Sequence, residues 1–182
     1  MDEESLLKIV KNATKKAGDE VLAIRSSGNL GVSKKEDDSI LTRADTICQK
    51  MLIEDLSDMG ATVLAEEKDD GLIARLNRQN KGSRYQLVID PIDGTRRFKS
   101  GKDDFAVSVA VTKDQRPIVG VIYAPAQGLI YSAQKGKGAS VTDVMSRETI
   151  LLRTTDNYDI NSLTLSMNPR ELLKGCYGHF FK

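Results

Sequence analysis

An apolar run that ends in two carboxylates and a tight turn is the feature that most constrains this chain. Residues 87–89 are Leu, Val and Ile, and residues 90–95 read Asp-Pro-Ile-Asp-Gly-Thr. The proline fixes its own φ, and the glycine permits a backbone conformation that other residues avoid. The sequence therefore predicts a buried strand and a defined turn, which together hold the carboxylates of Asp90 and Asp93 three positions apart.

Two carboxylates in such a place suit a divalent cation such as Mg²⁺, because hard cations take oxygen ligands. Gly94 and Thr95 then offer backbone N–H groups and a hydroxyl at a predicted helix start, where a phosphate group binds favourably. A metal beside a phosphate indicates phosphoryl chemistry. The spacing taken alone also fits an ordinary solvated loop, because carboxylates are mostly surface residues.

Three motifs follow one another in a recognisable order. Residues 90–95, with Phe98 after them, resemble the signature of the inositol monophosphatase superfamily. Residues 65–67 (Ala-Glu-Glu) resemble its [GS]-E-E element, and residues 38–45 resemble its D-S-P-x-T-x-A-D element, with Ile40 in place of the proline. Members of that superfamily are Mg²⁺-dependent, Li⁺-inhibited phosphomonoesterases. The resemblance implies an α+β fold, with a layered helix-on-antiparallel-sheet lobe followed by a second α/β lobe.

Further segments favour one branch, the 3'(2'),5'-bisphosphate nucleotidases of CysQ type. Residues 34–39, 84–85 and 116–126 resemble that branch, whereas Ile92 is commoner among inositol monophosphatases and residues 96–98 depart from the nucleotidase pattern. The implied reaction is removal of the 3'-phosphate from 3'-phosphoadenosine 5'-phosphate or its sulfated relative. An inositol monophosphatase or another small sugar-phosphate phosphatase is the alternative. A non-catalytic module that binds metal or phosphate and acts through a partner is a third interpretation, from a different class.

The resemblance also implies roles for individual residues, with Mg²⁺ as the cofactor. The implied metal ligands are Glu66, Asp90, Asp93 and the carbonyl of Ile92; the implied catalytic residues are Glu66, Thr95 and Asp45; and the implied phosphate-binding residues are Asp93, Gly94 and Thr95. Asp45 would orient the hydroxyl of Thr95, and that hydroxyl would position the attacking water together with Glu66.

Several of these residues have ordinary alternatives. Thr42 and Asp45 also have the spacing of a helix capping box, and Glu66 could simply end a strand in solvent. Four basic residues could attract a second substrate phosphate or form a solvated basic face: Arg96, Arg97, Lys99 and Lys102. The single histidine, His179, is interpreted as incidental surface.

Hydrophobic periodicity predicts two helices followed by strands. The first helix carries its apolar residues at Leu6, Ile9, Val10, Ala13, Ala17 and Val21. The second begins after Thr42, buries Ala44, Ile47, Met51, Leu52 and Leu56, and ends at Gly60. Strands are predicted at 62–65, 85–90, 105–112, 118–123, 128–133 and near 148–153, with a hairpin turn at 125–128 and a mobile loop over 68–82.

The length of 182 residues fits one ordinary domain, which we divide into a metal-binding lobe at 1–155 and the beginning of a second lobe at 156–182. The chain has no Trp, so it lacks the W-D-x-A-A element in which the family carries a further metal-ligating Asp. We read the chain as truncated before the second lobe. We therefore expect weak or no turnover, an exposed apolar surface and possible homo-oligomers.

Charge and cysteine usage exclude some partners and compartments. The chain has 27 basic and 26 acidic residues, so no net field attracts nucleic acid or a membrane. Its acidic start lacks an apolar segment, which argues against a secretory signal. Cys48 and Cys176 lie far apart without metal-binding spacing, which is typical of reduced thiols in the cytoplasm. The expected partner is a small phosphorylated substrate, either a nucleotide bisphosphate or a sugar phosphate.

Overall fold

The computed structural model describes residues 3–34, 40–69 and 71–154. Its helices are α1 (Glu3–Ser27), α2 (Arg43–Leu56), the short 3-10 helix η1 (Ser57–Met59), α3 (Leu72–Gln79) and α4 (Thr95–Lys99). Its strands are β1 (Ser33–Lys34), β2 (Ile40–Leu41), β3 (Thr62–Ala65), β4 (Tyr85–Asp93), β5 (Ala106–Lys113), β6 (Arg116–Ala124), β7 (Leu129–Gln134), β8 (Gly138–Asp143) and β9 (Thr149–Leu152).

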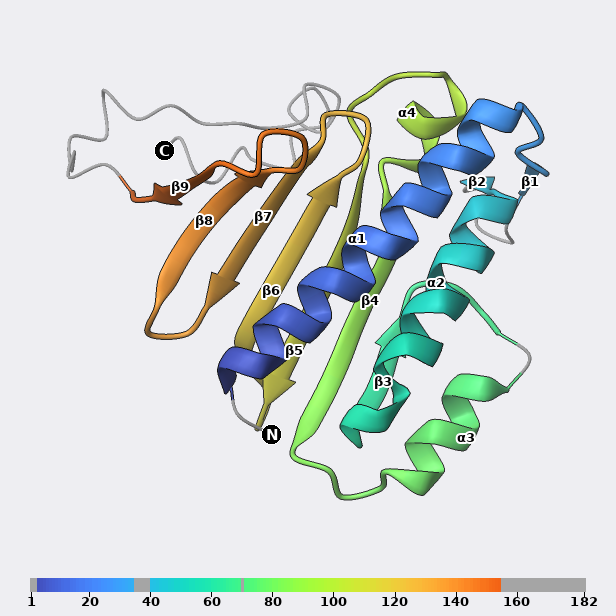
Figure 1. Ribbon diagram of the computed structural model, residues 1–182. Coiled ribbons are helices and arrows are strands. Elements are labelled where there is room, and N and C mark those ends of the chain that lie inside the picture. Colours follow the sequence, from blue (N-terminus) through green and yellow to red (C-terminus); the bar gives the residue numbers. More distant parts are fainter. Residues whose placement is uncertain (1–2, 35–39, 70, 155–182) are drawn as a thin grey trace, which may run out of the picture. The chain divides into compact units, whose positions relative to one another are not determined.

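Strands β3 to β9 form one seven-stranded sheet in sequence order, and β1 and β2 form a separate two-stranded ribbon. All neighbours in the large sheet are antiparallel except β3 and β4, which run parallel. Helices α1 and α2 lie side by side over one face of the sheet (Figure 1). The expected α+β fold with helices layered on a sheet is confirmed, but the sheet is mixed at β3–β4 rather than wholly antiparallel.

Helix α1 packs its apolar stripe against the middle of the sheet. Val10 and Val21 are fully buried there, whereas Ile9, which the sequence placed on the same stripe, is 39% exposed. Gly18 allows close packing, because a Cβ at this position would lie 2.3 Å from Cδ1 of Tyr123. The hydroxyl of Tyr123 donates to Asp19, 2.8 Å away, and thereby ties β6 to α1.

The predicted mobile loop over 68–82 was wrong, because it contains α3. This helix lies against β3, the edge strand of the sheet (Figure 1). The side-chain amide of Asn77 accepts from the N–H of Val63 at 2.6 Å and donates to its carbonyl at 2.9 Å. Asn77 thus satisfies the two backbone groups of Val63 on the open edge of β3.

Four strands also differ from expectation. The short strands β1 and β2 and the strand β8 were not predicted from the sequence, and β4 continues to Asp93 instead of ending at Asp90. The hairpin between β6 and β7 is confirmed. Residues 156–182, which include Cys176, His179 and the predicted start of a second lobe, lie outside the described residues.

The two faces of the sheet differ in how they are covered. Val121 on β6 is buried beneath the helices, and its neighbour Ile122, which points to the opposite face, is 46% exposed. Tyr131 on β7 pairs with Ile122 and is 37% exposed. A shallow groove of ≈ 300 Å³ runs over this face between Ile122, Tyr131 and Leu152. An exposed apolar surface, as expected, is therefore present.

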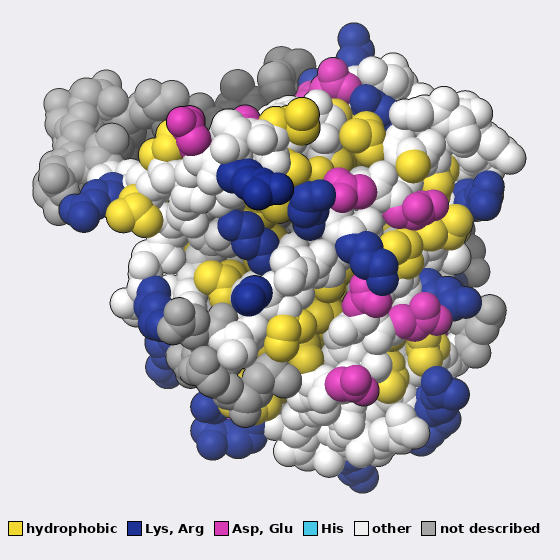
Figure 2. All heavy atoms as spheres, in the orientation of Figure 1, with side chains coloured by type: hydrophobic (Ala, Val, Ile, Leu, Met, Phe, Trp, Pro, Cys, Tyr) yellow, Lys and Arg dark blue, Asp and Glu magenta, His cyan; other side chains and the backbone are white. Residues whose placement is uncertain are grey.

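The helix-covered face has a mixed surface. Figure 2 shows both basic and acidic side chains over α1 and α2, in keeping with the near-zero net charge. Within the described residues, none of the helices is long and apolar enough to cross a membrane.

Candidate functional site

Glu66 and Asp90 meet because each follows one member of the last residue pair between two parallel strands. Ala65, the last residue of β3, pairs with Ile89 on β4, and the N–H of Glu66 extends the ladder by donating to the Ile89 carbonyl at 3.2 Å. The Glu66 side chain lies within hydrogen-bonding reach of the Asp90 carboxyl group. The parallel β3–β4 pair is therefore what brings these two residues together.

The site is strongly acidic. Burial raises the pKa of Asp90 to about 7, and the hydrogen bond and charge of Glu66, followed by the charges of Asp93 and Asp45, add to this effect. One carboxyl oxygen of Asp90, Oδ1, is buried without a hydrogen-bond partner in the described part of the chain. A buried carboxylate oxygen without a donor is costly, so this atom calls for an explanation.

A bulge separates the two aspartates of the turn. The pairing of β4 with β5 shifts register between Asp90 and Asp93, and the intervening Pro91 and Ile92 are buried. Asp93 itself is exposed. The bulge therefore gives the two carboxylates different environments, although they remain close enough for the charge of Asp93 to raise the pKa of Asp90.

The glycine after the bulge is required by its geometry. Gly94 has φ 88° and caps the N-terminus of α4. A Cβ at this position would lie 3.1 Å from the carbonyl oxygen of Asp104 and 3.4 Å from Cα of Phe105. Conformation and space therefore both disfavour a side chain at Gly94, and the predicted helix start at Thr95 is confirmed.

The hydroxyl of Thr95 is engaged, but not by the predicted partner. It donates to the Ile92 carbonyl at 3.0 Å. Asp45 instead accepts from the Thr42 N–H at 2.7 Å and from the Thr42 hydroxyl at 2.5 Å. The capping-box interpretation of Asp45 is confirmed, whereas its role toward Thr95 stays a prediction.

Asp45 nevertheless belongs to the acidic cluster. It is fully buried, and burial raises its pKa against the lowering effect of the Thr42 bonds. Its Oδ1, like that of Asp90, is buried without a hydrogen-bond partner among the described residues. The two orphaned oxygens belong to the N-terminal turn of α2 and to β4.

Two residues that hold the segments carrying Glu66 and Asp90 were not predicted from the sequence. The Cys48 thiol donates to the Pro91 carbonyl at 3.3 Å, and the Gln49 side chain bonds both backbone groups of Glu67. Asp45, Cys48, Gln49 and Leu52 follow helical spacing, and all four are buried. The signal in the sequence was the presence of polar residues on the otherwise apolar stripe of this helix.

The oxygen atoms of this site are of the chemical type that a hard divalent cation binds. Carboxylate oxygens of Glu66 and Asp90 lie together, and Asp90 Oδ1 lacks a donor that would satisfy it. Over the described ranges, the side chains as they stand do not gather three histidine, cysteine, aspartate or glutamate groups around one point. Glu66 and Asp90 therefore form the nucleus of the candidate metal centre, and ligation by Asp93 and Ile92 stays a prediction.

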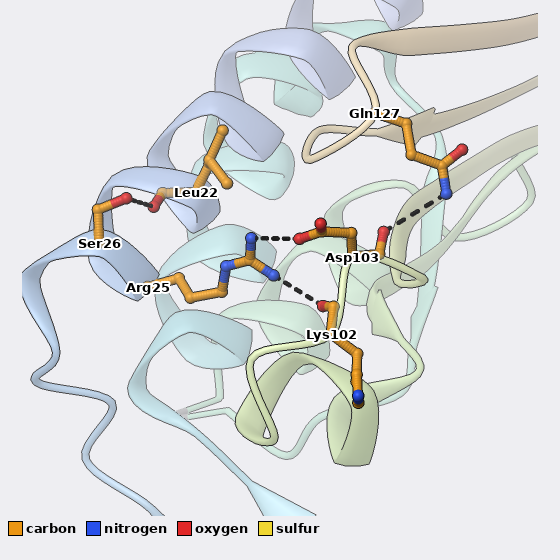
Figure 3. Close-up of polar contacts among 6 residues, drawn as sticks. All are labelled: Leu22, Arg25, Ser26, Lys102, Asp103 and Gln127. Atoms are coloured by element: carbon orange, nitrogen blue, oxygen red, sulfur yellow. Dashed lines mark hydrogen bonds and ion pairs between the residues drawn. The ribbon is translucent and has the colours of Figure 1, made fainter.

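Of the basic residues that follow the turn, Arg96, Arg97 and Lys99 lie on α4. Lys102 lies on the loop after α4, and this loop is anchored from α1. The Arg25 guanidinium donates to the Lys102 carbonyl and to the Asp103 carboxylate, each at 2.7 Å (Figure 3). The same guanidinium lies over the Phe105 ring. The Lys102 side chain points away from this anchor (Figure 3). Arg97 pairs with Asp104 at 2.5 Å, so part of its charge is neutralised.

The comparisons with known proteins agree with one another. A sequence model of the inositol monophosphatase family matches residues 2–171. The chain is 33% identical over 135 residues to the 3'(2'),5'-bisphosphate nucleotidase CysQ of Escherichia coli K12, which covers 72% of this chain and 53% of that protein. It is 28% identical over 190 residues to a histidinol-phosphatase of Chlorobaculum parvum, which covers 95% and 71%.

A solved structure supports the same fold. CysQ from Bacteroides thetaiotaomicron, described as a bacterial member of the inositol monophosphatase family, superposes with a TM-score of 0.64 at 27% identity. The similarity covers 85% of this chain and 60% of that one. The chain thus spans about half the length of the CysQ relatives that it matches.

Proposed function

This chain belongs to the inositol monophosphatase family, and from that premise we propose that it carries the metal-binding half of a Mg²⁺-dependent phosphomonoesterase. The observation that carries the proposal is that Glu66, directly after β3, lies beside Asp90 on β4, with Asp90 Oδ1 buried and unsatisfied. One relative is named a bisphosphate nucleotidase and another a histidinol-phosphatase, and both names support the same reaction class.

The proposed roles follow the chemistry of the donors. Glu66, Asp90, Asp93 and the Ile92 carbonyl would hold Mg²⁺, which neutralises phosphate charge and lowers the pKa of bound water. The carboxylate of Glu66 and the hydroxyl of Thr95 would orient the attacking water. Asp93 and the N–H groups of Gly94 and Thr95 would bind phosphate oxygens. Asp45 would orient the hydroxyl of Thr95.

The proposed substrate is 3'-phosphoadenosine 5'-phosphate or its sulfated relative, which would lose the 3'-phosphate. The 33% identity to CysQ supports this choice. The exposed Lys99 and Lys102 offer charge for a second phosphate group. Ile92 and the match to a histidinol-phosphatase favour the second candidate, a phosphatase of inositol or other small sugar or alcohol phosphates.

A location in the cytoplasm is also proposed. Cys48 is a free, buried thiol, and its burial raises its pKa, which disfavours the reactive thiolate. Such a cysteine is compatible with a reducing compartment.

Phosphate release by the purified chain tests the proposal. The assay offers 3'-phosphoadenosine 5'-phosphate and inositol 1-phosphate side by side with Mg²⁺, and an Asp93→Asn variant serves as the control for contaminating phosphatase. Release from the nucleotide, lost in the variant, is the expected result. Because the chain spans about half of its CysQ relatives, we expect the rate to be low. Mg²⁺ binding without release from any phosphate ester would instead favour the non-catalytic module.

A further inference from the structure

The segment that carries Glu66 leaves the sheet directly after this residue. Glu66 is still attached to β4 through its N–H, which donates to the Ile89 carbonyl, and the next peptide group belongs to no strand. The position of the Glu66 side chain therefore depends on the contacts that hold the following residue. In this chain, that residue is the buried Glu67.

Gln49 holds Glu67 through both of its backbone groups. The Gln49 amide donates from Nε2 to the Glu67 carbonyl at 2.9 Å, and its Oε1 accepts from the Glu67 N–H at 2.9 Å. Two bonds from one planar amide fix both the position and the orientation of the backbone that they grip. Gln49 is only 3% exposed, so water does not compete for these bonds.

The neighbouring residue on α2 holds the other carboxylate segment. Cys48 donates to the carbonyl of Pro91, the residue after Asp90. One turn of helix α2 therefore grips the chain immediately after Glu66 and immediately after Asp90. The two carboxylates repel each other when charged, so a fixed separation has to be imposed by contacts of this kind.

We propose that Gln49 is a positioning residue that holds Glu66 opposite Asp90 and thereby sets the affinity of the site for a divalent cation. This role rests on the proposed function, since it requires that Glu66 and Asp90 bind the cation. Gln49 reaches the cation only through the Glu67 backbone and is not a catalytic residue. Removing contacts that orient metal ligands typically lowers metal affinity about 10–100-fold.

A Gln49→Met variant tests the role, since methionine keeps the length of the side chain and removes both hydrogen bonds. The matched control is Gln134→Met, which changes another buried glutamine, on β7 and three strands away from β4. Isothermal titration with Mg²⁺ measures the dissociation constant of the wild-type chain and of both variants. We expect at least a roughly tenfold weaker affinity for Gln49→Met, and a change of less than about twofold for Gln134→Met.

Amide hydrogen exchange supplies a readout that does not depend on the variants. The Glu67 amide of the metal-free wild-type chain should be protected, because its N–H is bonded to a buried acceptor. Exchange of that amide at the rate of an open loop would overturn the proposal, even if Gln49→Met failed to fold. Unchanged Mg²⁺ affinity in a folded Gln49→Met variant would overturn it as well.

The same titration distinguishes a failure of the positioning role of Gln49 from a failure of the proposed metal site. If the wild-type chain binds Mg²⁺ and Gln49→Met binds equally well, the positioning role fails and the metal site stands. If the wild-type chain binds no Mg²⁺, the proposed function fails and takes the positioning role with it.

Discussion

At the scale of single residues, the candidate site contains groups that lower the stability of the metal-free fold. Asp90 has a buried, unsatisfied oxygen beside the carboxyl group of Glu66, and Asp45 adds a second such oxygen. Each of these features disfavours the charged, metal-free fold. Groups that are costly in the empty protein and chemically suited to a cation are typical of functional sites.

Asp90→Asn should raise the stability of the metal-free chain and abolish its response to Mg²⁺. The variant removes a negative charge that its surroundings disfavour, so we expect a melting temperature about 2–4 °C higher, equivalent to about 1 kcal/mol at this chain length. Wild-type protein with Mg²⁺ at about 100 times the dissociation constant should gain about 2.7 kcal/mol, and the variant should gain none.

Thermal unfolding followed by circular dichroism, with and without Mg²⁺, measures both effects. Asp58→Asn is the control, because Asp58 is an exposed aspartate on η1. A variant that is still stabilised by Mg²⁺ like the wild-type chain would remove Asp90 from the metal site.

Gly94→Ala should cost more than a glycine replacement in open space. Gly101→Ala is the matched control: its φ is 72° and nothing lies within 4 Å of the added Cβ. In both variants, alanine in a left-handed conformation lowers the free energy of unfolding by about 1 kcal/mol. Gly94→Ala also crowds the Asp104 carbonyl, so its total loss should be about 2–3 kcal/mol. Urea unfolding of the two variants measures the difference, and equal midpoints would contradict the argument.

At the scale of elements, the candidate site is assembled by one helix and two neighbouring strands. Strands β3 and β4 deliver Glu66 and Asp90, and the N-terminal half of α2 contributes the Thr42–Asp45 cap and the contacts of Cys48 and Gln49. The bulge in β4 then separates Asp90 from Asp93. The positions of the functional groups thus depend on α2 beginning at the correct residue.

Thr42→Ala should therefore destabilise the chain by about 1 kcal/mol, the usual cost of losing a helix cap. It removes the hydroxyl that lies 2.5 Å from the buried Asp45 carboxylate. Thr46→Ala, an exposed position in the first turns of the same helix, should change stability by less than about 0.5 kcal/mol. Chemical denaturation compares the two variants, and a Thr42→Ala variant as stable as Thr46→Ala would show that the cap contributes nothing.

The sequence was sufficient where the local pattern determines structure. The periodicity of α1, the turn between β6 and β7, and the helix start at Thr95 all follow from residues close together in the chain. Helix α3 and the Gln49–Glu67 contact were missed because they depend on partners 14 and 18 positions away. The helical spacing of Gln49 indicates that it is buried, but no local signal identifies Glu67 as its partner or Val63 as the partner of Asn77.

At the scale of the whole molecule, the sheet has one face under α1 and α2 and an opposite face with exposed apolar side chains. Ile122 and Tyr131 lie on that opposite face, and Leu152 borders the groove that they line. Exposed apolar patches favour association.

Self-association through this face is the prediction that belongs to this scale. The wild-type chain should form dimers or larger species, and Ile122→Lys should shift it toward monomer by charging the exposed face. Ile9→Lys is the matched control, since Ile9 is 39% exposed on α1 rather than on the open face of the sheet. Multi-angle light scattering measures the mass of all three proteins, and a monomeric wild-type chain would refute the prediction.

The central claim is that Glu66 and Asp90 together hold a divalent cation. Crystals of the chain soaked in Mn²⁺, which takes the oxygen ligands that Mg²⁺ takes, would test it through anomalous difference density. The account predicts a peak between the two carboxylates, with Asp90 Oδ1 among the nearest atoms. No peak at that position, or a peak bound elsewhere while Asp90 stays unligated, would contradict it.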